Sequence, residues 1–111
     1  MTATFSPAAS DDLMEIALFI AEDNPKRALS FIEELEDTCH QLSASPGIGT
    51  ARPDLREGLR SMPHGRYLIF YRQRDDETRI ERILHGSRDV DRSDVMGEDD
   101  ESPSASSRGD A

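Results

Sequence analysis

Residues 66–72 of the chain are Arg66-Tyr67-Leu68-Ile69-Phe70-Tyr71-Arg72. Aromatic and β-branched side chains are enriched in strands, so this stretch predicts a β-strand. Successive side chains of a strand point to opposite faces of a sheet, which places the two tyrosines and the isoleucine on one face and Leu68 and Phe70 on the other. Both faces of this strand are therefore apolar, and both need a cover.

The flanking sequence predicts further strands. A polar turn at residues 74–77 separates the first strand from a second at residues 78–85. Upstream, residues 55–62 lead into the first strand through a turn at Pro63-His64-Gly65. This spacing predicts a three-stranded antiparallel meander, with Ala3–Phe5 as a candidate fourth strand at its edge.

Two helices are predicted before the strands. Ser6-Pro7 and Asn24-Pro25 are helix-start signals, because the first side chain can accept a hydrogen bond from an unpaired amide and Pro has no amide proton to lose. Apolar residues at helical spacing follow each signal, and the second helix is predicted to stop near Ser45-Pro46-Gly47. The predicted fold class is therefore α+β, an N-terminal two-helix hairpin packed on a small antiparallel sheet of three to four strands.

A helical hairpin covers only one face of a sheet. The second face, with Leu68 and Phe70, must be covered by the chain's own end, by a second copy or by a different protein. We expect a different protein, whose binding surface includes this uncovered face.

Charge divides the chain into three parts. The 111 residues carry a formal net charge of −10, to which residues 1–45 contribute −7, residues 46–88 contribute +3 and residues 89–111 contribute −6. From Gly97 onward there is no large apolar side chain whose burial could offset the entropy cost of ordering. The sequence therefore predicts one domain over residues 1–90 and an acidic, disordered tail over residues 91–111.

Composition and spacing argue against several classes of function. A single cysteine, Cys39, rules out a disulfide framework, and no spacing of His, Asp or Glu predicts a metal site, so neither metal nor cofactor is expected. No apolar run is long enough to span a bilayer, and the chain starts without a signal-like segment, so we expect a cytoplasmic protein. The acidic balance argues against direct nucleic-acid binding.

Several short motifs occur in an order that resembles one family. They are Phe5-Ser6-Pro7-x-Ala9-x-x-Asp12-Leu13-x-x-Ile16, Ala28, Ser45-Pro46-Gly47-x-Gly49, Gly58-Leu59-Arg60, Tyr67-Leu68-Ile69-Phe70-Tyr71-Arg72 and Arg82-Ile83-Leu84-His85-Gly86-x-Arg88-Asp89. The ordered combination covers residues 3–90 and resembles the ParE toxins of the RelE/ParE superfamily. The resemblance implies a toxin of a type II toxin–antitoxin pair that inhibits DNA gyrase and is neutralised by a cognate ParD-like antitoxin in a hetero-oligomer.

The implied partners lead us to expect two sets of binding residues. For the antitoxin we expect the exposed side of the hairpin and the uncovered sheet face, and the candidates are Ile20, Phe31, Leu35, Leu68, Phe70, Arg66, Arg72 and Arg82. For the target we expect the end of the last strand and the segment after it, because the resemblance associates toxicity with this end. The candidates there are Arg60, His85, Arg88 and Asp89.

A RelE-like, ribosome-dependent mRNA endoribonuclease is the main alternative. Cleavage by a neighbouring 2′-hydroxyl needs a base, an acid and cations, and the candidates for these roles are His64, His85, Arg60, Arg66, Arg82 and Arg88. Residues 46–88 contain no lysine, no tyrosine follows Leu84, and the chain is acidic overall, all of which disfavour an RNA substrate. We therefore expect no catalytic residues and no enzyme. A non-toxic member that only binds an antitoxin is the second alternative.

Overall fold

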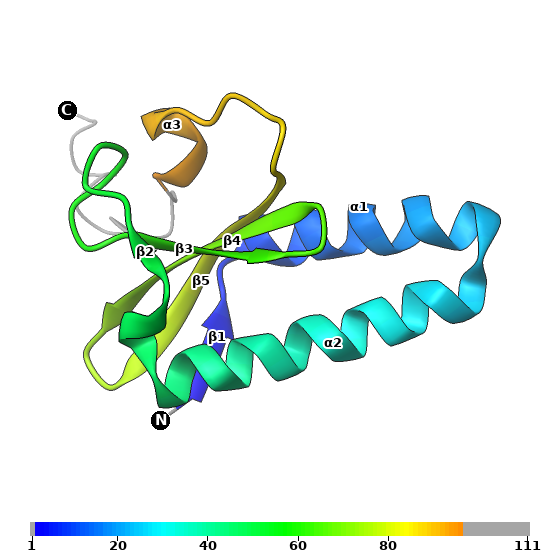
Figure 1. Cartoon of the computed structure of the whole chain (residues 1–111), viewed down its shortest axis with the longest axis horizontal. Coiled ribbons are helices and arrows are strands. Elements are labelled where there is room, and N and C mark those ends of the chain that lie inside the picture. The colour runs from blue at the N-terminus through cyan, green and yellow to red at the C-terminus, as the bar shows by residue number, and fades with distance from the viewer. Residues whose placement is uncertain (1, 97–111) are drawn as a thin grey trace, which may run out of the picture.

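The two predicted helices pack as a hairpin against a mixed sheet in the computed structural model, which describes residues 2–96 (Figure 1). The elements are β1 (Thr2–Phe5), α1 (Pro7–Asp23), α2 (Pro25–Ala44), the 3-10 turn η1 (Pro46–Ile48), β2 (Thr50–Ala51), β3 (Arg60–His64), β4 (Tyr67–Arg74), β5 (Glu77–His85) and α3 (Arg92–Val95). The strand order is β1-β5-β4-β3-β2, with β1 parallel to β5 and the other neighbours antiparallel. The α+β prediction is confirmed. The sheet has five strands rather than three or four, because β2 pairs with β3 as a short edge strand.

Both predicted helix starts are confirmed. Ser6 Oγ accepts a hydrogen bond from the Ala9 amide at 3.0 Å, and Asn24 Oδ1 accepts one from the Arg27 amide at 3.0 Å. These caps satisfy amides that have no partner within the helix. Ser6 Oγ also donates to the Glu81 carbonyl at 2.8 Å, so the start of α1 is fixed against β5.

The helical hairpin covers the first face of the sheet. The buried cluster there joins side chains of both helices to β4 and β5, namely Ala9, Ile16, Phe31, Leu35, Cys39, Leu42, Ile69, Tyr71, Ile80 and Ile83. Figure 1 shows that the distal half of the hairpin extends beyond the sheet. Side chains near the turn between α1 and α2 therefore have no sheet beneath them, and Leu18 and Phe19 are 60% and 69% exposed.

The second face is covered by the chain itself. A separate buried cluster joins Phe70 and Leu84 of the sheet to Leu55 and Leu59, which precede β3, and to Val95 of α3. In Figure 1, α3 and α2 lie on opposite sides of the sheet. Phe70 is fully buried. The prediction that this face waits for a different protein is therefore wrong. The chain covers it with α3, near its own end, and with the loop before β3.

The predicted domain boundary at residue 90 lies six residues too early in the chain. Asp91 caps α3, accepting hydrogen bonds from the Ser93 and Asp94 amides, while Asp94 Oδ2 accepts one from the Asp91 amide at 2.9 Å. Val95 is 1% exposed against the second cluster. Residues 91–96 thus belong to the folded domain, and the rest of the predicted tail, residues 97–111, lies outside the described residues.

A β-bulge in the central pair brings a carboxylate into the sheet. Phe70 is opposite Arg82 and Tyr71 is opposite Ile80, so Glu81 is an extra residue on β5. Glu81 is buried, and its Oε2 accepts a hydrogen bond from Arg72 Nε at 2.8 Å and lies 3.9 Å from Arg56 Nη1.

Within residues 2–96, no helix is both long and apolar enough to cross a membrane.

Candidate functional site

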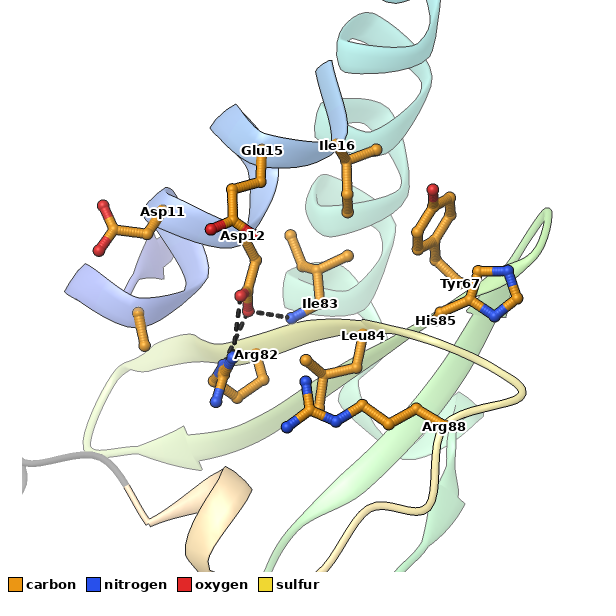
Figure 2. A pocket seen from close by; sticks show the side chains of 11 residues that line it. Asp11, Asp12, Glu15, Ile16, Tyr67, Arg82, Ile83, Leu84, His85 and Arg88 are labelled. Atoms are coloured by element: carbon orange, nitrogen blue, oxygen red, sulfur yellow. Dashed lines mark hydrogen bonds and ion pairs between the residues drawn. The ribbon is translucent and has the colours of Figure 1, made fainter. Parts of the chain in front are cut away.

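A groove lies between α1 and the C-terminal half of β5 (Figure 2). Its volume is about 450 Å³, and its lining residues are Ala8, Asp11, Asp12, Glu15, Ile16, Tyr67, Arg82, Ile83, Leu84, His85 and Arg88. One wall is acidic and comes from α1, while β5 and the loop after it supply the basic side chains. The groove therefore brings together three residues that the sequence marks as candidates, Arg82, His85 and Arg88.

Arg82 is held by the fold. Its Nε and Nη2 donate to the two carboxylate oxygens of Asp12 at 2.8 and 2.9 Å, as the dashed lines in Figure 2 show. Its Nη1 donates to the Asp94 carbonyl of α3 at 2.8 Å. The hydrogen bond to Asp12 raises the pKa of Arg82 above its usual value, against the opposing effect of burial. Arg82 thus joins α1, β5 and α3, and most of its guanidinium is used within the domain.

His85 is exposed at the end of β5. Its Nδ1 accepts a hydrogen bond from the Ser87 amide at 3.1 Å, and its ring lies edge-on to Tyr67 with 5.4 Å between the centroids. Because Nδ1 is the acceptor, the neutral ring carries its proton on Nε2. In this arrangement the Nε2–H of His85 can donate a hydrogen bond to a partner. The lone pair on Nδ1 is already used by the Ser87 amide.

Arg88 forms its ion pair with Asp94 of α3 and not with its neighbour Asp89. Arg88 Nη2 lies 2.6 Å from Asp94 Oδ1, so Arg88 anchors α3 to the groove, while Asp89 is exposed. This ion pair holds α3 against the segment that follows β5.

The remaining basic candidates are dispersed. Arg60 lies at the other end of the sheet, opposite Tyr71, and donates to the Gly49 carbonyl at 2.7 Å. Arg66 is exposed beside the groove, and its carbonyl accepts from the Gly86 amide at 2.7 Å. His64 faces α2, with Nε2 3.4 Å from Glu34 Oε1. The structure therefore groups Arg66, His85 and Arg88 and separates them from Arg60.

Three predicted antitoxin contacts are buried in the core. Phe31, Leu35 and Phe70 are 4%, 0% and 0% exposed, so their placement on an exposed face is wrong. The helical stripe that contains Phe31 and Leu35 faces the sheet, and the loop before β3 and α3 cover Phe70. Ile20 and Leu68 are half-buried at the edges of the two clusters.

Other apolar side chains occupy the exposed side of the hairpin. Met14, Leu18 and Leu29 are 60%, 60% and 65% exposed. An apolar groove of about 280 Å³ between the helices is lined by Phe5, Ser10, Leu13, Met14, Ala17, Ile32 and Glu36. Leu29 shares a helix face with Ile32, three residues later. We call Met14, Leu18, Leu29 and Ile32 the hairpin patch.

The hairpin patch has a sequence signal that a search for core positions misses. Met14 and Leu18 are four residues apart and so share one face of α1, but this face lies off the stripe that includes Ile16 and Ile20. An amphipathic helix with apolar residues on its polar side indicates a second contact surface.

Across residues 2–96, no group of three or more His, Cys, Asp and Glu side chains could hold a metal ion.

Comparison with known proteins identifies the family. A family model described as "ParE toxin of type II toxin-antitoxin system, parDE" matches residues 3–90. The chain is 36% identical over 78 residues to Toxin ParE3 of Caulobacter vibrioides, covering 69% of this chain and 78% of that toxin. It is 34% identical over 67 residues to Toxin ParE1 of Mycobacterium tuberculosis, covering 60% of this chain and 68% of that toxin. A chain of the solved "Chromosomal ParDE TA system from P. aeruginosa" has the same fold, with a TM-score of 0.65 and 22% identity over 77% of this chain and 95% of that one. The chain therefore belongs to the family of ParE toxins of type II toxin–antitoxin systems.

Proposed function

We propose that the chain inhibits DNA gyrase in the cytoplasm and that a ParD-like antitoxin neutralises it by laying an amphipathic segment on the hairpin patch. The proposed neutralisation by an antitoxin rests on one observation. Met14, Leu18 and Leu29 are exposed apolar side chains of the hairpin, and Met14 lines an apolar groove. Contiguous exposed apolar surface on a small domain is typical of a protein-binding site. Family membership supports this proposal, as does the name of the structural neighbour, a ParDE system.

The charge around the hairpin patch defines the chemistry of the partner segment. Residues 1–45 carry a net charge of −7, and Glu36 lies at the groove itself. A helix that places apolar residues at i, i+3/i+4 and i+7 on the patch, flanked by Lys or Arg, complements this surface. The proposed antitoxin segment is therefore amphipathic and basic where it meets α1 and α2.

For the target we propose a binding surface formed by Arg66, His85, Arg88 and Asp89. His85 and Arg88 line the groove beside α1, and all four residues are exposed. The same helix α1 contributes Asp11 and Glu15 to this groove and Met14 and Leu18 to the hairpin patch. An antitoxin bound along α1 would therefore lie next to the target surface, which is a direct route to neutralisation.

We propose that inhibition needs no catalysis by this chain. Phosphodiester cleavage would require a base and cations that converge on one phosphate. Arg82 is held by Asp12, and Arg60 is separated from the end of β5 by four residues along β4, about 13 Å. The lone pair of neutral His85 is used by the Ser87 amide. These contacts favour binding over RNA cleavage.

A supercoiling assay with purified gyrase tests the proposal. We expect the chain to block supercoiling and stabilise gyrase-linked DNA breaks, and the product of the adjacent antitoxin gene to restore activity. Primer extension on cellular transcripts after induction is the matched control. Codon-positioned cuts with intact gyrase activity would replace the proposal by the endoribonuclease alternative, and normal growth after induction without the antitoxin would replace it by the non-toxic alternative.

A further inference from the structure

Phe19 is an exposed aromatic side chain of α1 that neither site described above uses. The chain has four phenylalanines. Phe31 and Phe70 are buried and Phe5 is half-buried, whereas Phe19 is 69% exposed. Aromatic side chains are enriched in protein interfaces and often carry much of the binding energy. Phe19 is therefore a candidate contact with a partner, and its place on α1 decides which partner.

The turns of α1 place Phe19 in line with the acidic wall of the groove. Asp11 and Glu15 line the groove and follow one another along α1 in Figure 2. Phe19 is four residues after Glu15, so it lies on the same helix face, one turn nearer to the end of α1. Glu22 continues this face three residues later. We call Asp11, Glu15, Phe19 and Glu22 the α1 ridge.

The α1 ridge faces away from the apolar groove between the helices. Met14 lines that groove, and Phe19 follows it by five residues, which is about 140° around an α-helix. An antitoxin segment seated in the apolar groove would therefore leave Phe19 exposed. The ridge is instead continuous with the groove that His85 and Arg88 line.

The charge of the α1 ridge is negative. Its three carboxylates are exposed, and α1 contains no lysine or arginine. Arg82 and Arg88, on the other side of the groove, form ion pairs with Asp12 and Asp94 and not with the ridge. Complementary charge therefore favours an occupant that carries Lys or Arg on either side of an apolar side chain.

We propose that Phe19 is the apolar anchor of the target-binding surface. This inference rests on the proposed inhibition of gyrase and names the chemistry of the segment of gyrase that binds. An apolar side chain of that segment packs against Phe19, and neighbouring Lys or Arg pair with the carboxylates of the α1 ridge. Because exposed ion pairs contribute little each, the aromatic contact supplies most of the affinity and the charges set the orientation.

Gyrase inhibition by variants of the full chain tests the proposal. Phe19→Ala should weaken inhibition by about tenfold, while the affinity for the antitoxin and the midpoint of unfolding in urea stay those of the unchanged chain. Leu18→Ala is the matched control, because Leu18 is similarly exposed but belongs to the hairpin patch, and it should inhibit normally. Normal inhibition by Phe19→Ala overturns this inference alone, and so does a loss of antitoxin affinity as large as the loss of inhibition. An unchanged chain that does not inhibit gyrase overturns the proposed function and this inference together.

A charge-matched pair of variants tests the carboxylates of the α1 ridge. Asp11→Lys with Glu15→Lys should weaken inhibition by about tenfold, and added salt should narrow the difference from the unchanged chain. Glu33→Lys with Asp37→Lys makes the same change in net charge, at the same spacing, on exposed side chains of α2 and should inhibit normally. Equal losses in the two variants would mean that net charge alone matters and would overturn the proposed contact.

A photo-crosslinking residue in place of Phe19 identifies the bound segment directly. We expect a crosslink to gyrase, in a peptide where Lys or Arg flanks an apolar side chain. The same residue in place of His40, which is exposed on α2, is the control and should not crosslink to gyrase. A crosslinked peptide rich in Asp and Glu, or a crosslink only between two copies of this chain, would overturn the proposal.

Discussion

Asp12 and Arg82 are seventy residues apart in the chain and form a two-point ion pair, with nitrogen–oxygen distances of 2.8 and 2.9 Å. The same carboxylate accepts a hydrogen bond from the Ile83 amide at 2.9 Å. Arg82 also reaches the Asp94 carbonyl. One carboxylate thus sets how α1 lies on β5 and, through Arg82, where α3 sits. The wall of the groove between α1 and β5 and the cover of the second sheet face depend on the same pair.

Asp12→Ala should destabilise the domain by about 2–4 kcal/mol, because it leaves the partly buried Arg82 without its counter-charge and the Ile83 amide without an acceptor. The free energy of unfolding in urea measures this. Asp11→Ala is the control, since Asp11 is exposed and we expect a change within about 0.5 kcal/mol. Equal effects for the two variants would show that the ion pair does not contribute to stability.

Val95→Ala should lower the free energy of unfolding by about 1–3 kcal/mol, because it removes methyl groups from the cluster around Phe70 and Leu84. Met96→Ala, at an exposed side chain one residue later, should have almost no effect. Hydrogen exchange of the β4 amides gives a second reading and should become faster only in Val95→Ala. A domain that tolerates Val95→Ala without loss would contradict the role of α3 as the cover of this face.

The sequence predicts those features that depend on neighbouring residues. The caps at Ser6 and Asn24 and the alternation along residues 67–71 are local, and the structure confirms them. The cover of the second face is not local, since Leu55 and Val95 are forty residues apart and each lies in a mostly polar segment. No periodicity marks such residues, so the sequence could state only that some cover was needed.

The candidate site shows the same difference between local features, which the sequence predicts, and contacts between distant residues, which it does not. The position of His85 at the end of the last strand comes from the alternation pattern and is confirmed. The engagement of Arg82 by Asp12 depends on the packing of a helix on a strand seventy residues later, which spacing alone does not give. The sequence analysis missed the hairpin patch because Met14 and Leu18 lie off the apolar stripe that predicts the core face of α1, and both are exposed.

The buried thiol of Cys39 predicts a loss of stability at alkaline pH. The pKa of this thiol is raised from 9.0 to about 12. Burial is the main cause, and the charge of Glu36 is the lesser one. The unfolded chain loses this proton first, so the contribution of Cys39 is complete below about pH 9 and is lost as the pH rises towards 12. The slope due to this group is at most about 1.4 kcal/mol per pH unit. Cys39→Ala should show a shallower fall of unfolding free energy over this range, measured in urea, and equal slopes would contradict the raised pKa.

Leu18→Asp should weaken antitoxin binding by roughly tenfold to a hundredfold, since it places a charge in the apolar contact proposed at the hairpin patch. Phe19→Asp is the matched control, because Phe19 is similarly exposed but lies one residue further round α1. Titration calorimetry with the purified antitoxin measures both. Inhibition of gyrase by Leu18→Asp alone should stay at the level of the unchanged chain. Equal losses of antitoxin affinity in the two variants would mean that the contact surface is not the hairpin patch.

His85→Ala should have the opposite profile, with gyrase inhibition weakened by about tenfold and antitoxin binding unchanged. The ring is exposed and its polar contacts within residues 2–96 are to Ser87, so the free energy of unfolding should change by no more than about 0.5 kcal/mol. His40→Ala, at an exposed histidine of α2 away from the groove, is the control and should inhibit gyrase normally. His85→Gln separates the two roles considered for this residue, because an amide retains a hydrogen-bond donor but cannot exchange a proton. A binding role predicts substantial recovery of inhibition in His85→Gln, whereas a variant as inactive as His85→Ala would point back to proton transfer and so to the endoribonuclease alternative.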